Sequence, residues 1–226
     1  MIKSIKNLTK FELGLWVFSL LVVTGSFLIG STSGYLTLAA SLVGVTALIF
    51  VSKGDVTGQV LTVVFSILYA VISYTFQYYG EMITYLGMTM PIAIMSVVSW
   101  IRNPYSEKEV KVSHLTKKQF AKVFVLAMIV TLLFYFILRY FETANLMAST
   151  ISITTSFLAS FFMFLRSSAY ALSYAANDIV LIVLWTMAAM ENISYLPMIV
   201  CFVMFFVNDM YGFFNWRRMK ERQVKD

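Results

Sequence analysis

Two Asn-Asp pairs lie inside long apolar stretches near the C-terminus: Asn177 with Asp178, and Asn208 with Asp209. We place no other carboxylate inside the membrane. Ionisable groups there are costly and generally mark a binding site or a transport route. If the two stretches are helices joined by a short turn at 191–194, both pairs lie roughly 10–13 Å from helix ends on the same side. The two carboxylates should therefore stand at nearly the same depth.

A polar and aromatic stripe runs along the first of these two helices. Tyr170, Tyr174, Asn177, Asp178 and Trp185 fall within about 100° of one another at 100° per residue. Aromatic faces and carboxylates attract a planar cation, and amides hydrogen-bond hydroxyls or another amide. The stripe therefore predicts one wall of a cavity for a small solute with a cationic ring, an amide and a sugar.

A structural role is the alternative for the same residues. The Asn and Asp side chains can hold helices together by interhelical hydrogen bonds alone. For Trp185, helix packing or anchoring at the membrane interface explains the residue equally well.

Composition places the chain in the membrane and argues against catalysis. Of 226 residues, 60% are hydrophobic and only 12% are charged, whereas a soluble domain has about 25% charged residues. The single cysteine, Cys201, excludes an intramolecular disulfide and a cysteine metal cluster. The single histidine, His114, lies in a charged loop without a second ligand nearby. With no Walker A motif and no nucleophile–base set, we expect neither an enzyme nor a bound metal or cofactor.

Eight apolar runs are long enough to cross a bilayer, which takes about 20 residues. The sequence therefore predicts an all-α polytopic membrane protein with eight transmembrane helices.

We expect the first run to be a retained helix rather than a signal peptide. Pro91 should kink the fourth run. We expect 102–119 to be a loop with at most a short surface helix, and the tail after Trp216 to be solvated. The runs are approximately 13–29, 35–51, 59–79, 82–101, 120–138, 145–165 and the two helices within 167–216.

The basic residues predict the orientation of these spans. With the N-terminus in the cytoplasm, 16 of the 17 Lys and Arg residues fall on the inner side, and only Arg139 falls outside. Glu81, Glu142 and Glu191 then occupy outer turns. Because cytoplasmic loops are enriched in Lys and Arg, both termini should be inside. The net charge of +6 thus reflects orientation in the membrane, where lipid is the surrounding partner, and we expect no nucleic acid partner.

An internal repeat organises the single membrane domain, residues 1–226. Each of two three-helix sets contains a basic residue after its first helix, an acidic turn, and a Trp-Arg ending near Trp100 or Trp216. We expect a parallel 3+1+3 arrangement, which is typical of secondary transporters. Its parts are an extra N-terminal helix at 1–31, a first repeat at 35–102, a cytoplasmic loop and linker helix at 103–141, a second repeat at 145–217, and a cytoplasmic tail at 218–226.

Three stretches, AANDIVLIVLW, YYGEMITYLGM and NDMYGFFNWRRM, resemble the PnuC family of bacterial nicotinamide riboside transporters, and the resemblance covers essentially the whole chain. It implies a fold similar to the SWEET sugar transporters and a homotrimer in the bacterial inner membrane. It also implies inward facilitated diffusion of nicotinamide riboside, which cytosolic phosphorylation then traps for NAD salvage. This solute carries a pyridinium cation, a carboxamide and a ribose.

The family's binding motif, W-x-x-W-x-x-x-N, is matched only in its final residue. Asn177 takes the Asn position, with Tyr170 and Ser173 at the two Trp positions; a frame ending at Asp178 places Ala171 and Tyr174 there instead. Relatives of this family carry thiamine, riboflavin or deoxynucleosides, so these stay open as substrates. By resemblance, Asn208 also lines the site, and Thr84 and Tyr85 lie in the matching region of the first repeat.

Two further hypotheses remain open from the residues. In the first, the protein is a proton-coupled transporter in which Asp178 or Asp209 carries the proton. In the second, it is a membrane scaffold that transports nothing, and the polar pairs only hold its helices.

Overall fold

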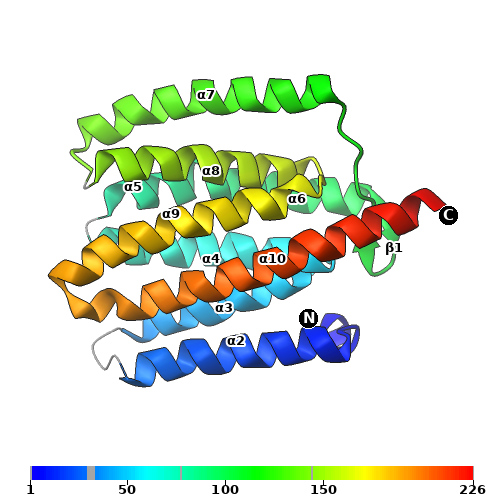
Figure 1. The fold of residues 1–226 in the computed structure, drawn as a ribbon, viewed down its shortest axis with the longest axis horizontal. Coiled ribbons are helices and arrows are strands. Elements are labelled where there is room, and N and C mark those ends of the chain that lie inside the picture. The colour runs from blue at the N-terminus through cyan, green and yellow to red at the C-terminus, as the bar shows by residue number, and fades with distance from the viewer. Residues whose placement is uncertain (1, 30–33, 77, 144, 226) are drawn as a thin grey trace.

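The computed structural model describes residues 2–29, 34–76, 78–143 and 145–225 as a bundle of long helices (Figure 1). Eight helices of this described part are long and apolar enough to cross a membrane. Both termini and a short hairpin lie at one end, here called the polar end (Figure 1). The elements are α1 (Ile2–Lys6), α2 (Lys10–Ile29), α3 (Tyr35–Ser52), α4 (Val56–Thr75), α5 (Tyr79–Thr84), a π-helical segment (Tyr85–Thr89), α6 (Met90–Arg102), β1 (Pro104–Ser106), β2 (Glu109–Val110), α7 (Lys117–Tyr140), α8 (Leu146–Phe164), α9 (Ala169–Glu191), a 3₁₀ turn (Ile193–Tyr195) and α10 (Leu196–Lys225).

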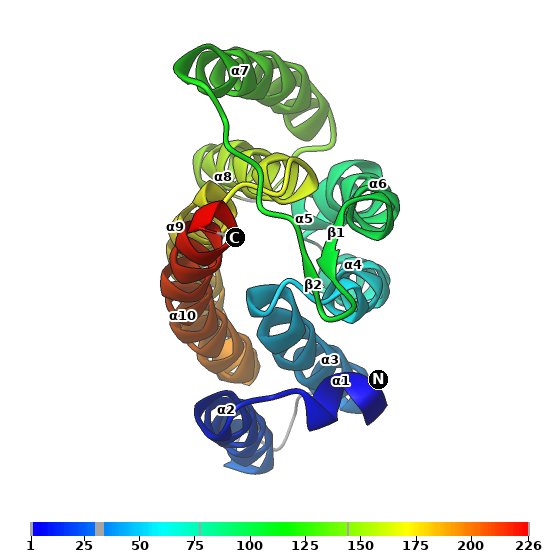
Figure 2. The same ribbon diagram turned by 90° about the vertical axis from the view of Figure 1, so that its right-hand side faces the viewer.

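Seen along the bundle, two groups of three helices face each other (Figure 2). One group contains α3, α4 and α6, and the other contains α8, α9 and α10. The groups meet where α3 packs against α10 and where α6 packs against α8. Outside this arrangement, α7 packs on α8, and α2 lies beside α3 and α10.

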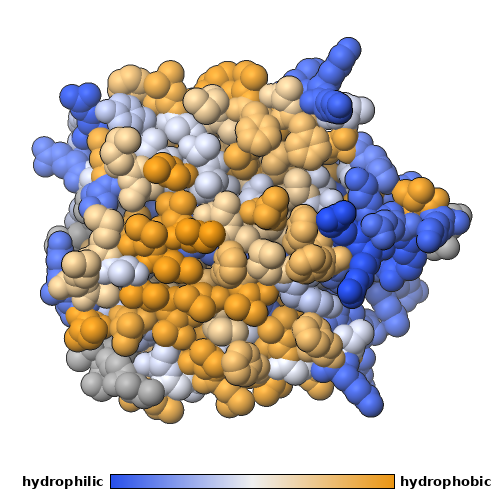
Figure 3. All heavy atoms as spheres, viewed as in Figure 1, coloured by the Kyte–Doolittle hydropathy of each residue, from blue (hydrophilic) through white to orange (hydrophobic). Residues whose placement is uncertain are grey.

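The surface divides into zones of different hydropathy (Figure 3). Apolar side chains dominate the middle of the bundle, and polar side chains gather at the polar end. Helix α7 exposes a continuous apolar face that includes Phe124, Met128, Leu132 and Phe136. An exposed apolar surface of this kind marks contact with lipid or with another protein.

Paired contacts join the two groups near the polar end. The Trp216 indole on α10 donates to the Val51 carbonyl at the end of α3, with an N–O distance of 3.0 Å. In the same way, the Trp100 indole on α6 donates to the Met163 carbonyl at the end of α8, at 3.2 Å. The two indole rings pack at 5.5 Å between centroids. Each third helix thus binds the end of the first helix of the opposite group.

The residue before each tryptophan makes the same kind of contact. Its side chain donates to the next carbonyl along the first helix of the opposite group. Asn215 donates to the Ser52 carbonyl at 2.8 Å, and Ser99 donates to the Phe164 carbonyl at 3.1 Å. These are the contacts expected from two repeats related by a rotation.

Replacing either tryptophan with Phe should therefore destabilise the protein by a similar amount. Trp100→Phe and Trp216→Phe each remove one indole donor and leave a small void in a buried cluster. We expect a loss of about 1–3 kcal/mol for each. Thermal unfolding of the two single variants and the double variant measures this. Effects that differ by more than twofold between the two sites would contradict the equivalence of the contacts.

A buried acid fastens α2 to the bundle at the polar end. Glu12, only 2% exposed, accepts hydrogen bonds from the Thr9 amide, the Lys53 ammonium and the Tyr211 hydroxyl. The ammonium distance is 2.8 Å, so Lys53 and Glu12 form an ion pair. Because Lys53 follows α3 and Tyr211 is on α10, this one carboxylate joins three helices.

The expectations for the polar end need two corrections. Within the expected loop at 102–119, residues 104–110 form the antiparallel hairpin β1–β2, no surface helix is present, and α7 begins at Lys117. The tail belongs to α10, which continues to Lys225, and Met219 within it is buried. Its last turns pack against the hairpin, where Arg222 pairs with Glu109 and the Gln223 amide donates to the Val110 carbonyl. These contacts stabilise a stretch that is polar enough to be read as a loop.

The expected irregularity near Pro91 takes the form of a π-helical segment. The Met90 amide donates to the Tyr85 carbonyl, five residues earlier. Proline has no amide hydrogen, so Pro91 interrupts the regular ladder and the preceding turn widens. The widened turn lies against the interior of the bundle, where Tyr85 and Thr89 are buried.

Candidate functional site

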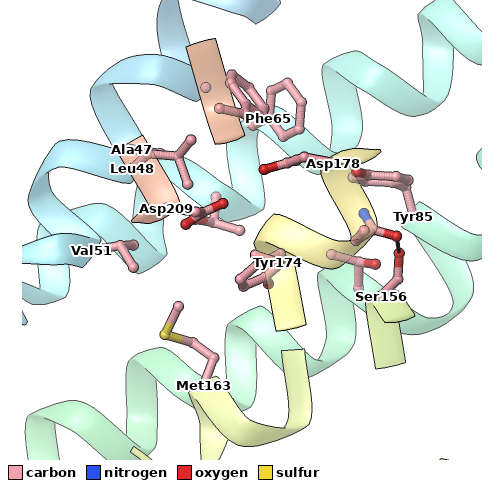
Figure 4. Close-up of a pocket in the computed structure, with 15 residues that line it drawn as sticks. Ala47, Leu48, Val51, Phe65, Tyr85, Ser156, Met163, Tyr174, Asp178 and Asp209 are labelled. Carbon is pink, nitrogen blue, oxygen red and sulfur yellow. Dashed lines mark hydrogen bonds between the residues drawn. The ribbon is translucent and has the colours of Figure 1, made fainter. Parts of the chain in front are cut away.

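A small enclosed pocket lies between the two groups of helices (Figure 4). Its volume is about 50 Å³, which is room for a few water molecules. Both groups contribute side chains, so the pocket lies at their interface. Its lining comprises Gly44, Ala47, Leu48, Val51, Thr62, Phe65, Tyr85, Thr89, Ser156, Met163, Tyr174, Asn177, Asp178, Phe205 and Asp209.

Two carboxyl groups face each other across this pocket (Figure 4). Asp178 on α9 and Asp209 on α10 are each 3% exposed, and their side chains lie within hydrogen-bonding reach of one another. The second oxygen of Asp178 has no hydrogen-bond partner among the described residues. No Lys, Arg or His belongs to the lining. Two acids without a basic partner create a site of negative potential inside an apolar bundle.

Asn177 is held in one orientation by α8. Its side-chain oxygen accepts from the Thr155 hydroxyl at 2.8 Å and from the Ser156 hydroxyl at 2.9 Å. With the oxygen occupied, the amide can offer only its two N–H donors to a solute. The arrangement therefore places hydrogen-bond donors beside the two acids.

Aromatic rings from both groups enclose the rest of the pocket. Tyr174 lies beside the acids, and its hydroxyl is 3.2 Å from the Ser160 hydroxyl (Figure 4). From the other group, the Phe65 and Tyr85 rings meet edge to face, with centroids 6.0 Å apart. Aromatic faces beside carboxylates are suited to a cationic ring.

Five of the nine residues expected in the site line this pocket: Tyr85, Tyr174, Asn177, Asp178 and Asp209. The expectation that the two aspartates stand at the same depth is confirmed, because their side chains meet. The other four, Thr84, Tyr170, Trp185 and Asn208, do not line it.

Tyr170 and Trp185 share the face of α9 that carries Asp178 but lie at other depths. Seven or eight residues separate each from Asp178, which is about 10–12 Å along a helix. Tyr170 packs against Trp216, with ring centroids 4.7 Å apart. Trp185 donates its indole hydrogen to the Tyr69 hydroxyl at 3.0 Å, toward the other end of the bundle. The predicted stripe was defined only by the angle of each residue around the helix axis, so it did not account for these distances along the axis.

Thr84 and Asn208 have structural partners instead. The Thr84 hydroxyl donates to the Gly80 carbonyl one turn earlier, at 2.8 Å. The Asn208 amide donates to the Ser19 hydroxyl of α2 at 3.0 Å and to the Met204 carbonyl. Asn208 therefore binds α10 to α2, which is the scaffold role that the sequence left open for it.

Nothing in the sequence identified several of the residues that line the pocket. Phe65, Thr62 and Thr89 are ordinary members of apolar runs. A signal was present in α8, where Ser149, Ser152, Ser156 and Ser160 recur every three or four residues and are all buried. Such a stripe faces one side of a helix, and here it faces α9 and the pocket.

Removing the hydroxyl that orients Asn177 should weaken solute binding moderately. Ser156→Ala leaves Thr155 as the single donor to the Asn177 oxygen, so the amide is less constrained. We expect a three- to tenfold increase in Kd for the transported solute, measured by calorimetry. Ser149→Ala, on the same stripe but outside the pocket lining, is the control and should leave Kd unchanged. Equal effects of the two substitutions would argue that the stripe matters only for packing.

Known proteins match the chain over nearly its full length. The family model described as nicotinamide mononucleotide transporter matches residues 34–218. The nicotinamide riboside transporter PnuC of Neisseria mucosa is 26% identical over 220 residues, which cover 95% of this chain and 83% of that protein. The same-named protein of Haemophilus influenzae is 22% identical over 191 residues, covering 83% and 81%.

A solved structure agrees with these matches. The crystal structure of the vitamin B3 transporter PnuC superposes with a TM-score of 0.85 at 26% identity, covering 96% of this chain and 94% of that one. Together with the enclosed polar pocket between two groups of membrane-spanning helices, the family match leads to one conclusion. The chain belongs to the nicotinamide mononucleotide transporter family and is a membrane transporter rather than an enzyme.

Proposed function

We propose that this protein carries nicotinamide riboside across the bacterial inner membrane by facilitated diffusion, for phosphorylation in the cytosol and NAD salvage. The observation that carries the proposal is the pair of facing acids, Asp178 and Asp209, with no basic residue in the pocket lining. A pyridinium cation supplies the missing positive charge. The carboxamide and ribose can accept hydrogen bonds from Asn177, and Tyr174, Phe65 and Tyr85 offer ring faces.

The pocket must widen before it admits such a solute. A volume of about 50 Å³ is well below the 300–1,000 Å³ of ordinary ligand sites. The described state is therefore closed around the acids. Widening requires the two groups of helices to move apart, as in alternating access.

Uptake into proteoliposomes tests the proposal. Radiolabelled nicotinamide riboside should enter saturably, equilibrate without accumulating, and exchange with unlabelled solute inside. Thiamine, riboflavin and deoxynucleosides serve as competitors, because they are the alternatives that the missing tryptophans left open. Saturable uptake of one of these with no uptake of nicotinamide riboside would reject the substrate while keeping the transport function.

The arrangement in the membrane is part of the proposal. We propose that both termini are cytoplasmic, that 35–102 and 145–217 are two repeats, and that the protein is a homotrimer. The charge distribution supports the first, and the paired Trp contacts support the second. Impermeant thiol labelling of Cys introduced at Lys225 or Glu191, in a variant lacking Cys201, tests orientation. Native mass spectrometry tests the oligomeric state.

Proton coupling is the second candidate, favoured by the contact between the two acidic side chains. Under this alternative, an imposed pH gradient drives accumulation above the outside concentration. The same proteoliposomes decide between the two mechanisms. Uptake that only equilibrates under a gradient supports facilitated diffusion.

A further inference from the structure

A third buried acid lies outside the central pocket. Glu81 was expected in an outer turn, but the structure places it inside α5, where it is 1% exposed. Neither carboxylate oxygen has a hydrogen-bond partner of normal geometry among the described residues. Keeping an ionisable side chain in such a place costs free energy, so packing alone does not explain it.

The surroundings of Glu81 offer hydroxyl groups and aromatic rings. The Ser152 hydroxyl of α8 is near enough to act on the carboxyl and has no other partner in the described chain. The Tyr69, Tyr78 and Tyr85 hydroxyls also lie within electrostatic range of it. No Lys or Arg is among the groups that act on it electrostatically. Among the described residues, Glu81 is therefore an acid without a positively charged partner.

Tyr85 connects this acid to the central pocket. Its ring lines the pocket, and both Glu81 and Asp178 lie within electrostatic range of its hydroxyl. The Tyr69 ring packs on Tyr85 with a centroid distance of 4.4 Å, and Trp185 is hydrogen-bonded to Tyr69. A layer of aromatic side chains thus separates Glu81 from the two aspartates.

Glu81 also differs from the two aspartates in its depth along the bundle. Helix α5 begins the span Tyr79–Arg102, which runs to the polar end. Glu81 therefore lies near the opposite end, and the aspartates lie deeper. A solute entering from the end opposite the termini would reach the depth of Glu81 before the depth of the two aspartates.

We propose that Glu81 is a second cation-binding residue, which receives the positive ring of the solute in the outer half of the path before the Asp178–Asp209 pair does. The inference rests on the proposed function, because it assumes a cationic organic solute. Ring faces of Tyr69 and Tyr85 then pass the cation between the two acidic sites, since aromatic faces attract a cation without requiring a counter-charge.

Two substitutions separate this role from packing. Glu81→Gln keeps the shape and removes the charge, whereas Glu81→Asp keeps the charge and shortens the side chain. We expect Glu81→Gln to lower the initial uptake rate of nicotinamide riboside at least tenfold below saturation, and Glu81→Asp to stay within threefold of wild type. A packing role predicts the reverse order, because only the shorter side chain leaves a void.

The matched control is Glu191→Gln, which neutralises an exposed acid at the same end of the bundle. It should leave uptake within twofold of wild type. Glu81→Met provides a second uncharged variant of similar size if Gln prevents folding, and size-exclusion chromatography confirms that each variant is folded.

Each outcome decides the proposal. A large loss in the uncharged variants with rescue by Asp supports it. Wild-type uptake by Glu81→Gln, or greater loss in Glu81→Asp than in Glu81→Gln, overturns it while leaving the proposed function intact. Equal loss of a pH-driven component in both uncharged variants, with undiminished exchange of nicotinamide riboside, assigns the site to a proton and overturns it as well. Absence of nicotinamide riboside uptake in the wild type overturns both proposals.

Discussion

The double substitution Asp178→Asn and Asp209→Asn should abolish measurable binding of nicotinamide riboside while making the empty protein more stable. The two expected effects have opposite signs because the acids serve the solute rather than the fold. An interaction with a charged group contributes about 1.5–3 kcal/mol, which corresponds to roughly ten- to a hundredfold in Kd for each acid. We therefore expect tenfold to a hundredfold for either single variant and at least a hundredfold for the pair.

The gain in stability follows from the absence of basic partners. Burying an ionisable group without an opposite charge costs free energy, and the isosteric amides should remove part of that cost. A chain of this length should then gain a few degrees in Tm. Calorimetric titration gives Kd, and thermal unfolding without solute gives Tm.

The experiment on the double variant needs a control, and two results would contradict the prediction. Glu221→Gln, an exposed acid on the last turns of α10, should change neither Kd nor Tm. If the double variant binds the solute as wild type does, cation recognition by this pair is wrong. If it is strongly destabilised instead, the acids hold helices together, as the scaffold hypothesis requires.

The largest effect on stability should come from Gly58→Ala, which we expect to prevent accumulation of folded protein. Gly58 is buried in the first turn of α4, against the end of α3. A Cβ there would lie 2.4 Å from the Val51 amide nitrogen and 2.9 Å from the Ala47 carbonyl oxygen. Both are backbone atoms, so no side-chain rotation relieves the overlap and α3 and α4 must separate. Overpacking costs about 1–3 kcal/mol even where neighbours adjust, and here the cost should be larger.

Gly25→Ala provides the comparison. Gly25 is inside α2, and a Cβ there meets nothing within 4 Å. Alanine in a helix is about 1 kcal/mol more favourable than glycine, so this variant should be as stable as wild type or more stable. Fluorescence-detected size-exclusion chromatography and thermal unfolding measure both. A Gly58→Ala variant with the wild-type Tm would contradict the close approach of α3 and α4.

The sequence predicted those features that depend on one segment at a time. The lengths of the apolar runs identified the eight spans. Each span must satisfy its own backbone hydrogen bonds while it crosses a hydrocarbon layer of fixed thickness. Rise per residue placed Asp178 and Asp209 at one level, since two helices joined by a short turn share an end. The similar endings at Trp100 and Trp216 predicted equivalent positions in two repeats, and each indole donates to a carbonyl at the end of a helix in the opposite group.

The contacts and burial of a side chain that depend on a neighbouring helix could not be predicted from the sequence. Trp185 belonged to the polar and aromatic stripe and Asn208 to the second Asn-Asp pair, yet Trp185 binds Tyr69 and Asn208 binds Ser19. Glu81 was predicted to lie in a turn because Gly80 and Glu81 separate two apolar runs. Its burial depends on α8 covering α5, which no local pattern records.

By itself, then, the sequence determined that this chain crosses a membrane eight times and carries two acids at one depth. The tertiary structure decided which side chains meet those acids, that the last turns of α10 pack on a hairpin, and that Glu81 is buried. The reason is physical. Hydropathy and helical rise belong to a single segment, whereas the rotation of each helix about its axis depends on packing against all its neighbours.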